Sequence, residues 1–163
     1  MKRSFILGII LILLTILDNS FMPFIAIRGI YPSLLFIFII SYSIINGKLE
    51  GTLIGVFSGI LQDIYFNNIF GINALLNMIL CLIAAEIGVN IIKKKRVIPV
   101  ITCFILSVVK GLLMVLINYI LKVNINYNTI IYSSIYSAVI AIIMYRIIYN
   151  FCNTKYMEKD WKF

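Results

Sequence analysis

The sequence predicts an all-α integral membrane protein that consists of a single bundle of six transmembrane helices. Of its 163 residues, 63% are hydrophobic and only 12% are charged, and the mean hydropathy is +1.08. Soluble domains are about half apolar and about a quarter charged, so this chain has too little polar surface for a soluble enzyme, a secreted domain or a disordered protein. The basic residues lie between long apolar runs, which is typical of membrane topology signals and not of a nucleic-acid-binding face.

Six apolar windows match the length of a transmembrane helix. A bilayer core requires about 20 apolar residues per helix, within a range of about 17–25. The second and third windows are short, so a tilted or re-entrant arrangement stays open for them. The windows form one membrane domain over residues 1–163 and cover residues 5–24, 31–46, 49–66, 70–92, 97–121 and 129–151.

The three prolines support these boundaries. Pro23 lies at the end of the first window, and Pro32 and Pro99 lie in the opening turns of the second and fifth. A proline is tolerated in the first turn of a helix, whereas inside a helix it removes a hydrogen bond. Lys2 and Arg3 precede the first window as they would in a signal peptide, but no Ala-x-Ala-like site follows. We therefore expect an uncleaved first helix.

The Lys and Arg residues predict the orientation of the bundle. Connections that carry more Lys and Arg face the cytoplasm, and only Arg28 and Lys122 fall on the opposite side. We therefore expect both termini to be cytoplasmic. The run from Lys93 to Arg96 is interpreted as a topology signal or as a contact with anionic lipid. The cytoplasmic set comprises Lys2, Arg3, Lys48, Lys93, Lys94, Lys95, Arg96, Lys155, Lys159 and Lys162.

The charged residues Asp18, Asp63, Glu86, Lys110 and Arg146 are expected to lie within the bilayer, where each needs a partner or a wet cavity. Counted from the cytoplasmic edge at about 1.5 Å per residue, Asp18, Asp63 and Lys110 share one depth. We expect Lys110 to be neutralised by Asp63, by Asp18 or by both. Glu86 and Arg146 form a second expected pair, nearer the cytoplasm. Such pairs either clip helices together, form a ligand site or proton route, or recognise a partner.

The third window carries three glycines at helical spacing. Gly51, Gly55 and Gly59 follow one another at intervals of four residues, and Asp63 comes four residues later. Small residues in this register form a groove that another helix backbone approaches closely. The groove serves either packing inside the bundle or docking of a partner's helix. We expect the face with these four residues to be the recognition surface.

No catalytic constellation is present in the sequence. The chain has no histidine, and its three cysteines, Cys81, Cys103 and Cys152, form no Cys-x-x-Cys pair. The cysteines are interpreted as reduced structural thiols. The few carboxylates form no metal-ligand cluster, and no base is available to activate a serine. We therefore expect a protein that is not an enzyme, with no catalytic, metal-binding or cofactor-binding residues.

Four segments between Arg28 and about residue 90 carry short motifs. They are Arg28-Gly29-Ile30-Tyr31-Pro32-Ser33-Leu34-Leu35, Asn46-Gly47-Lys48-Leu49-Glu50-Gly51, Gly55-Val56-Phe57-Ser58-Gly59-Ile60-Leu61-Gln62-Asp63 and Gly71-Ile72-Asn73-Ala74-Leu75. With these motifs this part of the chain resembles the rod shape-determining protein MreD family. In that family a Pro-x-Leu motif opens a helix, a Gly-rich helix ends on an aspartate, and a Gly-x-x-Ala-Leu motif starts the next helix. Ser33 stands where Asn or Asp is common in the family.

The resemblance implies a non-catalytic scaffold in the bacterial plasma membrane. Family members work in the cell-elongation machinery with MreC and, through it, with the actin-like MreB, with RodA and with a class B penicillin-binding protein. In that role the chain would link cytoskeletal filaments to lateral peptidoglycan synthesis and maintain cell shape. Membrane lipids are the other expected partners, and nucleic acid is not one.

Two other functions stay open. The substrate-binding S-component of an energy-coupling-factor vitamin transporter is similar in size and resembles MreD in fold, so an S-component-like bundle is expected in either case. Against it, the first window offers only Gly8 and no Ala-xxx-Ala pair for a transporter partner. The other alternative is an ion or proton carrier that uses Asp63 and Lys110.

Overall fold

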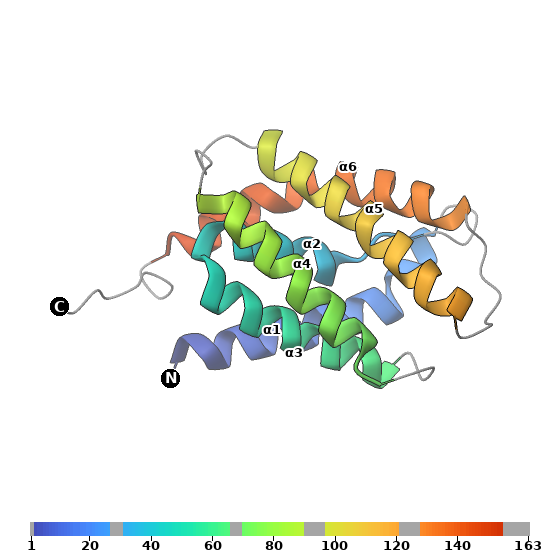
Figure 1. Ribbon diagram of the computed structural model, residues 1–163. Helices are drawn as coiled ribbons and strands as arrows, with labels where there is room; N and C mark the ends of the chain where they lie inside the picture. The colour runs from blue at the N-terminus through green and yellow to red at the C-terminus, as the bar shows by residue number, and fades with distance from the viewer. Residues whose placement is uncertain (1, 27–30, 66–69, 90–96, 121–127, 155–163) are drawn as a thin grey trace.

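The computed structural model describes residues 2–26, 31–65, 70–89, 97–120 and 128–154. These residues form six α-helices and one short 3-10 helix, which run back and forth as a single bundle (Figure 1). We name the end where α1, α3 and α5 begin the Arg3 end, and the end where α2, α4 and α6 begin the Asp63 end. The elements are α1 (Lys2–Ser20), η1 (Met22–Ile25), α2 (Leu34–Asn46), α3 (Lys48–Tyr65), α4 (Ile72–Val89), α5 (Val97–Ile120) and α6 (Asn128–Cys152).

The central element is α2, which contacts each of the other five α-helices. Every residue from Leu35 to Ile44 is buried, as expected for a helix that is apolar on nearly all sides. Its 13 residues extend for only about 20 Å at ~1.5 Å per residue. The other helices surround it, with α3 packed along α4 and α5 along α6.

Four helices are long and apolar enough to cross a membrane. They provide the segments Arg3–Ser20, Ile72–Val89, Val97–Ile120 and Ile135–Cys152. The helix α2 is apolar but shorter, and α3 contains three charged residues, Lys48, Glu50 and Asp63. The protein is therefore an all-α membrane protein, and the two elements outside this set are the two windows that the sequence marked as short.

Two predicted boundaries were wrong. The first helix ends at Ser20, and Pro23 lies in the first turn of the separate 3-10 helix η1 (Met22–Ile25) instead of at the end of α1. Pro32 precedes α2 by two residues instead of lying in its opening turn. The residue between them, Ser33, is the N-cap of α2. Pro99 does lie in the first turn of α5, as predicted.

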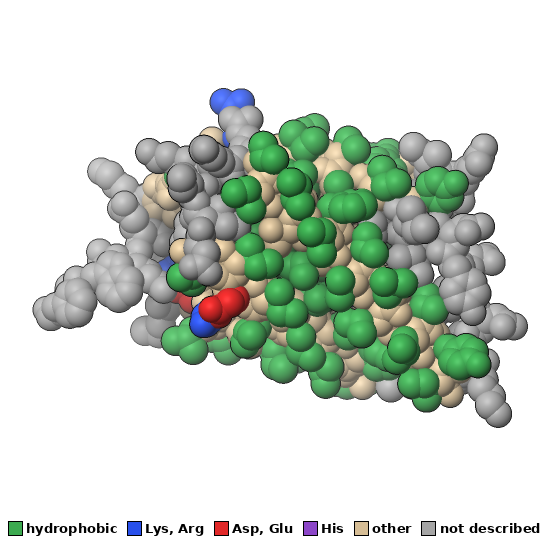
Figure 2. All heavy atoms as spheres, turned by 45° about the horizontal axis from the view of Figure 1, so that its top comes forward, with side chains coloured by type: hydrophobic (Ala, Val, Ile, Leu, Met, Phe, Trp, Pro, Cys, Tyr) green, Lys and Arg blue, Asp and Glu red, His purple; other side chains and the backbone are tan. Residues whose placement is uncertain are grey.

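The outside of the bundle is apolar. Large hydrophobic side chains of α1, α3, α4, α5 and α6 are exposed, among them Phe5, Phe57, Leu75, Leu116 and Ile143. Figure 2 shows one such face, on which acidic and basic side chains meet at a single place near its edge. A surface of this kind is suited to lipid, because hydrocarbon offers no partner to exposed polar groups.

Candidate functional site

Asp18 joins the end of α1 to the start of α2. It lies two residues before the end of α1 and is only 8% exposed. Its Oδ1 accepts from the backbone N–H of Leu34 at 2.8 Å, and its Oδ2 accepts from Leu35 N–H at 3.1 Å and from Ser33 Oγ at 2.8 Å. Ser33 Oγ in turn accepts from Phe36 N–H at 3.2 Å. The first backbone donors of α2, which have no partner within the helix, are thereby satisfied.

Asp63 plays the same part at the start of α4. It lies two residues before the end of α3 and is 3% exposed. Its Oδ2 accepts from the backbone N–H groups of Gly71 and Ala74 at 3.0 and 3.1 Å, and its Oδ1 accepts from the backbone and side-chain N–H of Asn73, both at 3.0 Å. Gly71 has a φ of 103°, a backbone conformation that favours glycine. The hairpins α1–α2 and α3–α4 therefore share one arrangement, in which an aspartate near the end of the first helix accepts the N–H groups at the start of the second.

Lys110 forms no direct ion pair with either aspartate within the described part of the chain, although both carboxylates lie near enough to interact with it electrostatically. Its Nζ donates to Gln62 Oε1 at 3.0 Å and lies 4.8 Å from the centroid of the Phe36 ring. Among the described residues, the ion pairs are formed by other side chains. The physical reason is that the oxygens of Asp18 and Asp63 already accept N–H groups at two helix starts, where the helix dipole also favours negative charge.

Gln62 connects Lys110 to a buried polar cluster between α3 and α4. Its Oε1 also accepts from Asn77 Nδ2 at 3.0 Å, and the same Nδ2 lies 3.3 Å from Ser58 Oγ. Asn77 is completely buried, and its Oδ1 has no hydrogen-bond partner within the described part of the chain. Polar groups in a low-dielectric interior interact strongly with one another, so this cluster ties the last third of α3 and the first third of α4 to the middle of α5.

The glycine face of α3 is covered by neighbouring helices. A Cβ atom added to Gly51 would lie 2.7 Å from Ser43 Oγ, and one added to Gly55 would lie 2.7 Å from the carbonyl oxygen of Asn77. At Gly59 the added atom would lie 2.2 Å from the Cα of Ala74. Gly51, Gly55, Gly59 and Asp63 are all buried. These residues therefore serve helix packing inside the bundle, and the expected exposed groove for a partner is not formed.

Glu86 and Arg146 are not brought together, which corrects the second predicted pair. Glu86 Oε2 forms an ion pair with Lys48 Nζ at the Arg3 end, and the two side chains are 57% and 52% exposed. Arg146 is exposed on α6. The residues Lys93, Lys94, Lys95 and Arg96 lie outside the described part of the chain.

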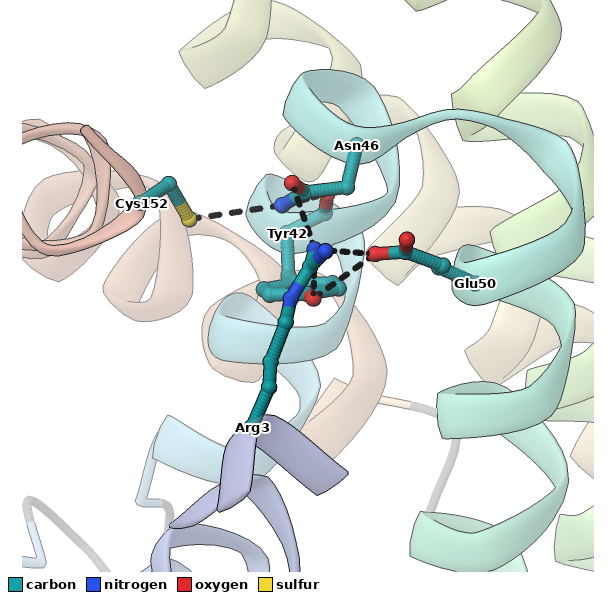
Figure 3. A network of polar contacts seen from close by, with 5 residues as sticks. All are labelled: Arg3, Tyr42, Asn46, Glu50 and Cys152. Carbon is teal, nitrogen blue, oxygen red and sulfur yellow. Dashed lines mark hydrogen bonds and ion pairs between the residues drawn. The ribbon is translucent and has the colours of Figure 1, made fainter. Parts of the chain in front are cut away.

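A polar network at the Arg3 end links four helices (Figure 3). Arg3 Nη2 forms an ion pair with Glu50 Oε2 and donates to Tyr42 Oη at 2.9 Å and to Asn46 Oδ1 at 3.1 Å. Tyr42 Oη also donates to Glu50 Oε2 at 2.9 Å. Asn46 Nδ2 lies 3.4 Å from Cys152 Sγ. The start of α1, the end of α2, the start of α3 and the end of α6 therefore meet at this network.

Sequence reasoning missed this network and the amide cluster. Arg3 was assigned only to membrane topology, and Gln62 and Asn77 carry no charge that would draw attention to them. A usable signal was present for Arg3 and Glu50, since both begin helices on the same side of the predicted bundle and carry opposite charges.

The cysteines and the possible metal-ligating residues remain to be placed. Cys81, Cys103 and Cys152 are buried and free of disulfide bonds. Over the described residues, Cys, Asp and Glu side chains form no group of three or more that would hold a metal ion.

Comparison with known proteins agrees with the resemblance seen in the sequence. No curated protein and no solved structure matches the chain. The family model for the rod shape-determining protein MreD matches residues 1–155 of the 163-residue chain. This match extends well beyond residues 28–90, on which the resemblance was based, and it gives no support to the transporter-subunit alternative. The chain belongs to the MreD family of rod shape-determining proteins.

Proposed function

We propose that this protein is a non-catalytic scaffold of the bacterial cell-elongation machinery. In this role it connects MreC, and through it MreB, to lateral peptidoglycan synthesis by RodA and a class B penicillin-binding protein. Membership of the family gives a rod-shape-determining role, and the partners and the mode of action are the proposed part.

One observation carries the scaffold proposal. The two deeply buried carboxylates, Asp18 and Asp63, each accept the N–H groups that start the following helix. A carboxylate committed to backbone donors holds helices in place and is poorly placed to exchange a proton with a substrate. The same contacts count against the ion or proton carrier that would use Asp63.

We further propose that all six helices span the inner membrane with both termini in the cytoplasm. The alternating directions of the helices support this topology (Figure 1). So does the placement of Lys and Arg, since only Arg28 and Lys122 lie between helices at the Asp63 end. In this arrangement α2 crosses the membrane inside the bundle, and α3 crosses it with its glycine face covered by neighbouring helices and its other face exposed.

Depletion of the protein in a rod-shaped host tests the function. We expect depleted cells to widen and to lose wall incorporation along their sides, and we expect the wild-type chain to restore both. Gly8→Ala is a matched control, because a Cβ at Gly8 meets no atom within 4 Å, and it should restore shape fully. Depleted cells with normal width and normal lateral wall incorporation would contradict the proposal.

A crosslinking scan tests the proposed partners. Because the glycine face of α3 is buried, the scan should use positions on the exposed sides of the helices. Leu53 on α3, Leu116 on α5 and Ile143 on α6 are suitable, since their side chains are 60%, 57% and 66% exposed. We expect crosslinks to MreC from at least one helix. Their absence from every exposed helix, with the protein folded and functional, would rule out direct contact.

A further inference from the structure

One side of α6 is exposed along the part of the helix that leads to the Arg3 end. The exposed residues recur at intervals of three or four, so they share one side of the helix. The opposite side is buried in the bundle, through residues such as Tyr145 and Ile148. In order along the helix, the exposed side carries Val139, Ile142, Ile143, Arg146, Ile147 and Asn150.

Arg146 is the charged residue of α6, and it lies on this exposed side. Within the described part of the chain it forms no ion pair and no hydrogen bond. The described Asp and Glu side chains are engaged elsewhere, at the starts of α2 and α4 and in the two ion pairs of the Arg3 end. A charged side chain that faces a membrane needs a partner, so the partner of Arg146 comes from outside these residues.

The order of the residues on this side matches the two parts of a phospholipid. Arg146 precedes Cys152, the last residue of α6, by six positions, which is about 9 Å along the helix. Asn150 lies one turn closer to that end, and Asn153 and Thr154 after the helix are also exposed and polar. Because an arginine keeps its stem in apolar surroundings while its guanidinium extends toward water, Arg146 reaches the level of the lipid headgroups.

The deeper part of this side suits acyl chains better than a partner helix. Val139, Ile143 and Ile147 are 55%, 66% and 57% exposed, and all three are branched and aliphatic. Helices that pack against one another in a membrane use small residues at their interface, which let the backbones approach closely. The exposed positions from Val139 to Asn150 contain no glycine, alanine or serine, so this surface is suited to hydrocarbon chains.

A phosphate is the headgroup that the polar part fits. A guanidinium donates two parallel N–H groups to phosphate oxygens, and the side-chain amide of Asn150 offers another donor one turn away. The ammonium group of a zwitterionic headgroup would find no free carboxylate among the described residues, since those are already engaged. The site therefore favours a headgroup with a net negative charge.

We propose that the exposed side of α6 binds an anionic phospholipid. Its phosphate is held by Arg146 and Asn150, and its acyl chains lie along Val139, Ile143 and Ile147. This site adds a lipid contact to the proposed scaffold and does not depend on any of the proposed protein partners, so the two proposals fail separately.

Photolabelling of the full-length protein in vesicles tests the site. The vesicles consist of phosphatidylcholine with a small fraction of phosphatidylglycerol that carries a diazirine in its acyl chain. The matched probe is phosphatidylethanolamine with the same diazirine, and mass spectrometry of peptides identifies the labelled residues. Leu116 on α5, which is 57% exposed, serves as a reference position.

We expect phosphatidylglycerol to label Ile143 and Ile147 about fivefold more than phosphatidylethanolamine does, and both lipids to label Leu116 equally. Arg146→Gln should abolish this preference, and Arg146→Lys should keep part of it, because an ammonium attracts phosphate without the two-pronged contact. Lys48→Gln is the control, since Lys48 is an exposed basic residue at the same end that already pairs with Glu86, and it should leave the preference unchanged.

Equal labelling of α6 by the two lipids in the wild-type protein would overturn the proposal, and this comparison does not depend on the folding of any variant. A preference that survives Arg146→Gln would overturn it too, because other basic residues would then attract the lipid. Displacement of phosphatidylglycerol from α6 by a transmembrane peptide with a Glu near one end would have the same consequence, since it would assign Arg146 to a protein partner.

Discussion

The two ends of the bundle are held together in different ways. At the Asp63 end, Asp18 and Asp63 accept backbone N–H groups, each at the start of one helix. At the Arg3 end, a network of side chains gathers four helices around one guanidinium (Figure 3). Backbone donors at a buried helix start have no substitute partner, whereas the members of a side-chain network keep some contacts when one is lost. We therefore expect single substitutions to be more damaging at the Asp63 end.

Asp63→Ala is expected to have the largest effect. It leaves three backbone N–H groups and the Asn73 amide without an acceptor, which should lower the free energy of unfolding by about 3–4 kcal/mol. Asp63→Asn keeps one accepting oxygen and should lose about half as much. Thermal unfolding of the purified protein in detergent measures both. A smaller loss for Asp63→Ala than for Arg3→Gln would reverse the comparison between the two ends.

Gly59→Ala tests the close contact of α3 and α4 at the Asp63 end. The added Cβ would lie 2.2 Å from a backbone Cα, so the helices must separate, and we expect a loss of about 2–3 kcal/mol. Gly8→Ala is the matched control on α1 and should not destabilise the protein, because nothing lies within 4 Å of the new atom. The same unfolding assay reads both, and equal stability of the two variants would contradict the close packing.

A double-mutant cycle of Arg3→Gln and Glu50→Gln tests the Arg3 end. The two side chains are 21% and 25% exposed, so their interaction is only partly screened by solvent. We expect a coupling energy of about 1–2 kcal/mol that decreases as salt is added. A coupling near zero at low salt would mean that the four helices are held at this end by packing alone.

Glu86→Gln should have the smallest effect. The Lys48 and Glu86 side chains are both more than half exposed, and exposed ion pairs contribute about 0.2–1 kcal/mol or nothing measurable. Thermal unfolding of this variant should give the smallest loss in the free energy of unfolding among these variants. A loss equal to that of Arg3→Gln would mean that the exposed Lys48–Glu86 pair stabilises the protein as much as the less exposed Arg3–Glu50 pair.

Hydropathy predicted the helices well because each apolar run reports on one helix at a time. The window 97–121 became α5 at Val97–Ile120, and the window 49–66 became α3 at Lys48–Tyr65. The burial of the glycine face of α3 agrees with the interpretation that its spacing serves packing inside the bundle. Hydropathy does not report how the helices are ordered around α2, so it could not show that this face is covered.

The partners of the polar residues were harder to predict. Counting charges by depth placed Asp63 and Lys110 together, but it ignored backbone N–H groups at helix starts, which are the actual donors to Asp63. It also ignored uncharged amides, although Gln62 is adjacent to Asp63 in the sequence and is the residue that Lys110 contacts. Counting residues from the helix ends thus placed Asp63 and Lys110 in the same region of the bundle. Which atoms they contact is decided by the backbone N–H groups that compete with Lys110 for the Asp63 oxygens.

The enclosure of α2 has a consequence for how the protein responds to membranes of different thickness. At about 20 Å, a helix of this length is shorter than a hydrocarbon core of ~30 Å and, if exposed to lipid, would force the bilayer to thin. The five helices that contact α2 bury its residues from Leu35 to Ile44, so we expect the bilayer to adapt to them instead. Changes in bilayer thickness should then be met by tilting of the surrounding helices, among which α5 with 24 residues is the longest apolar span, while α2 keeps its length.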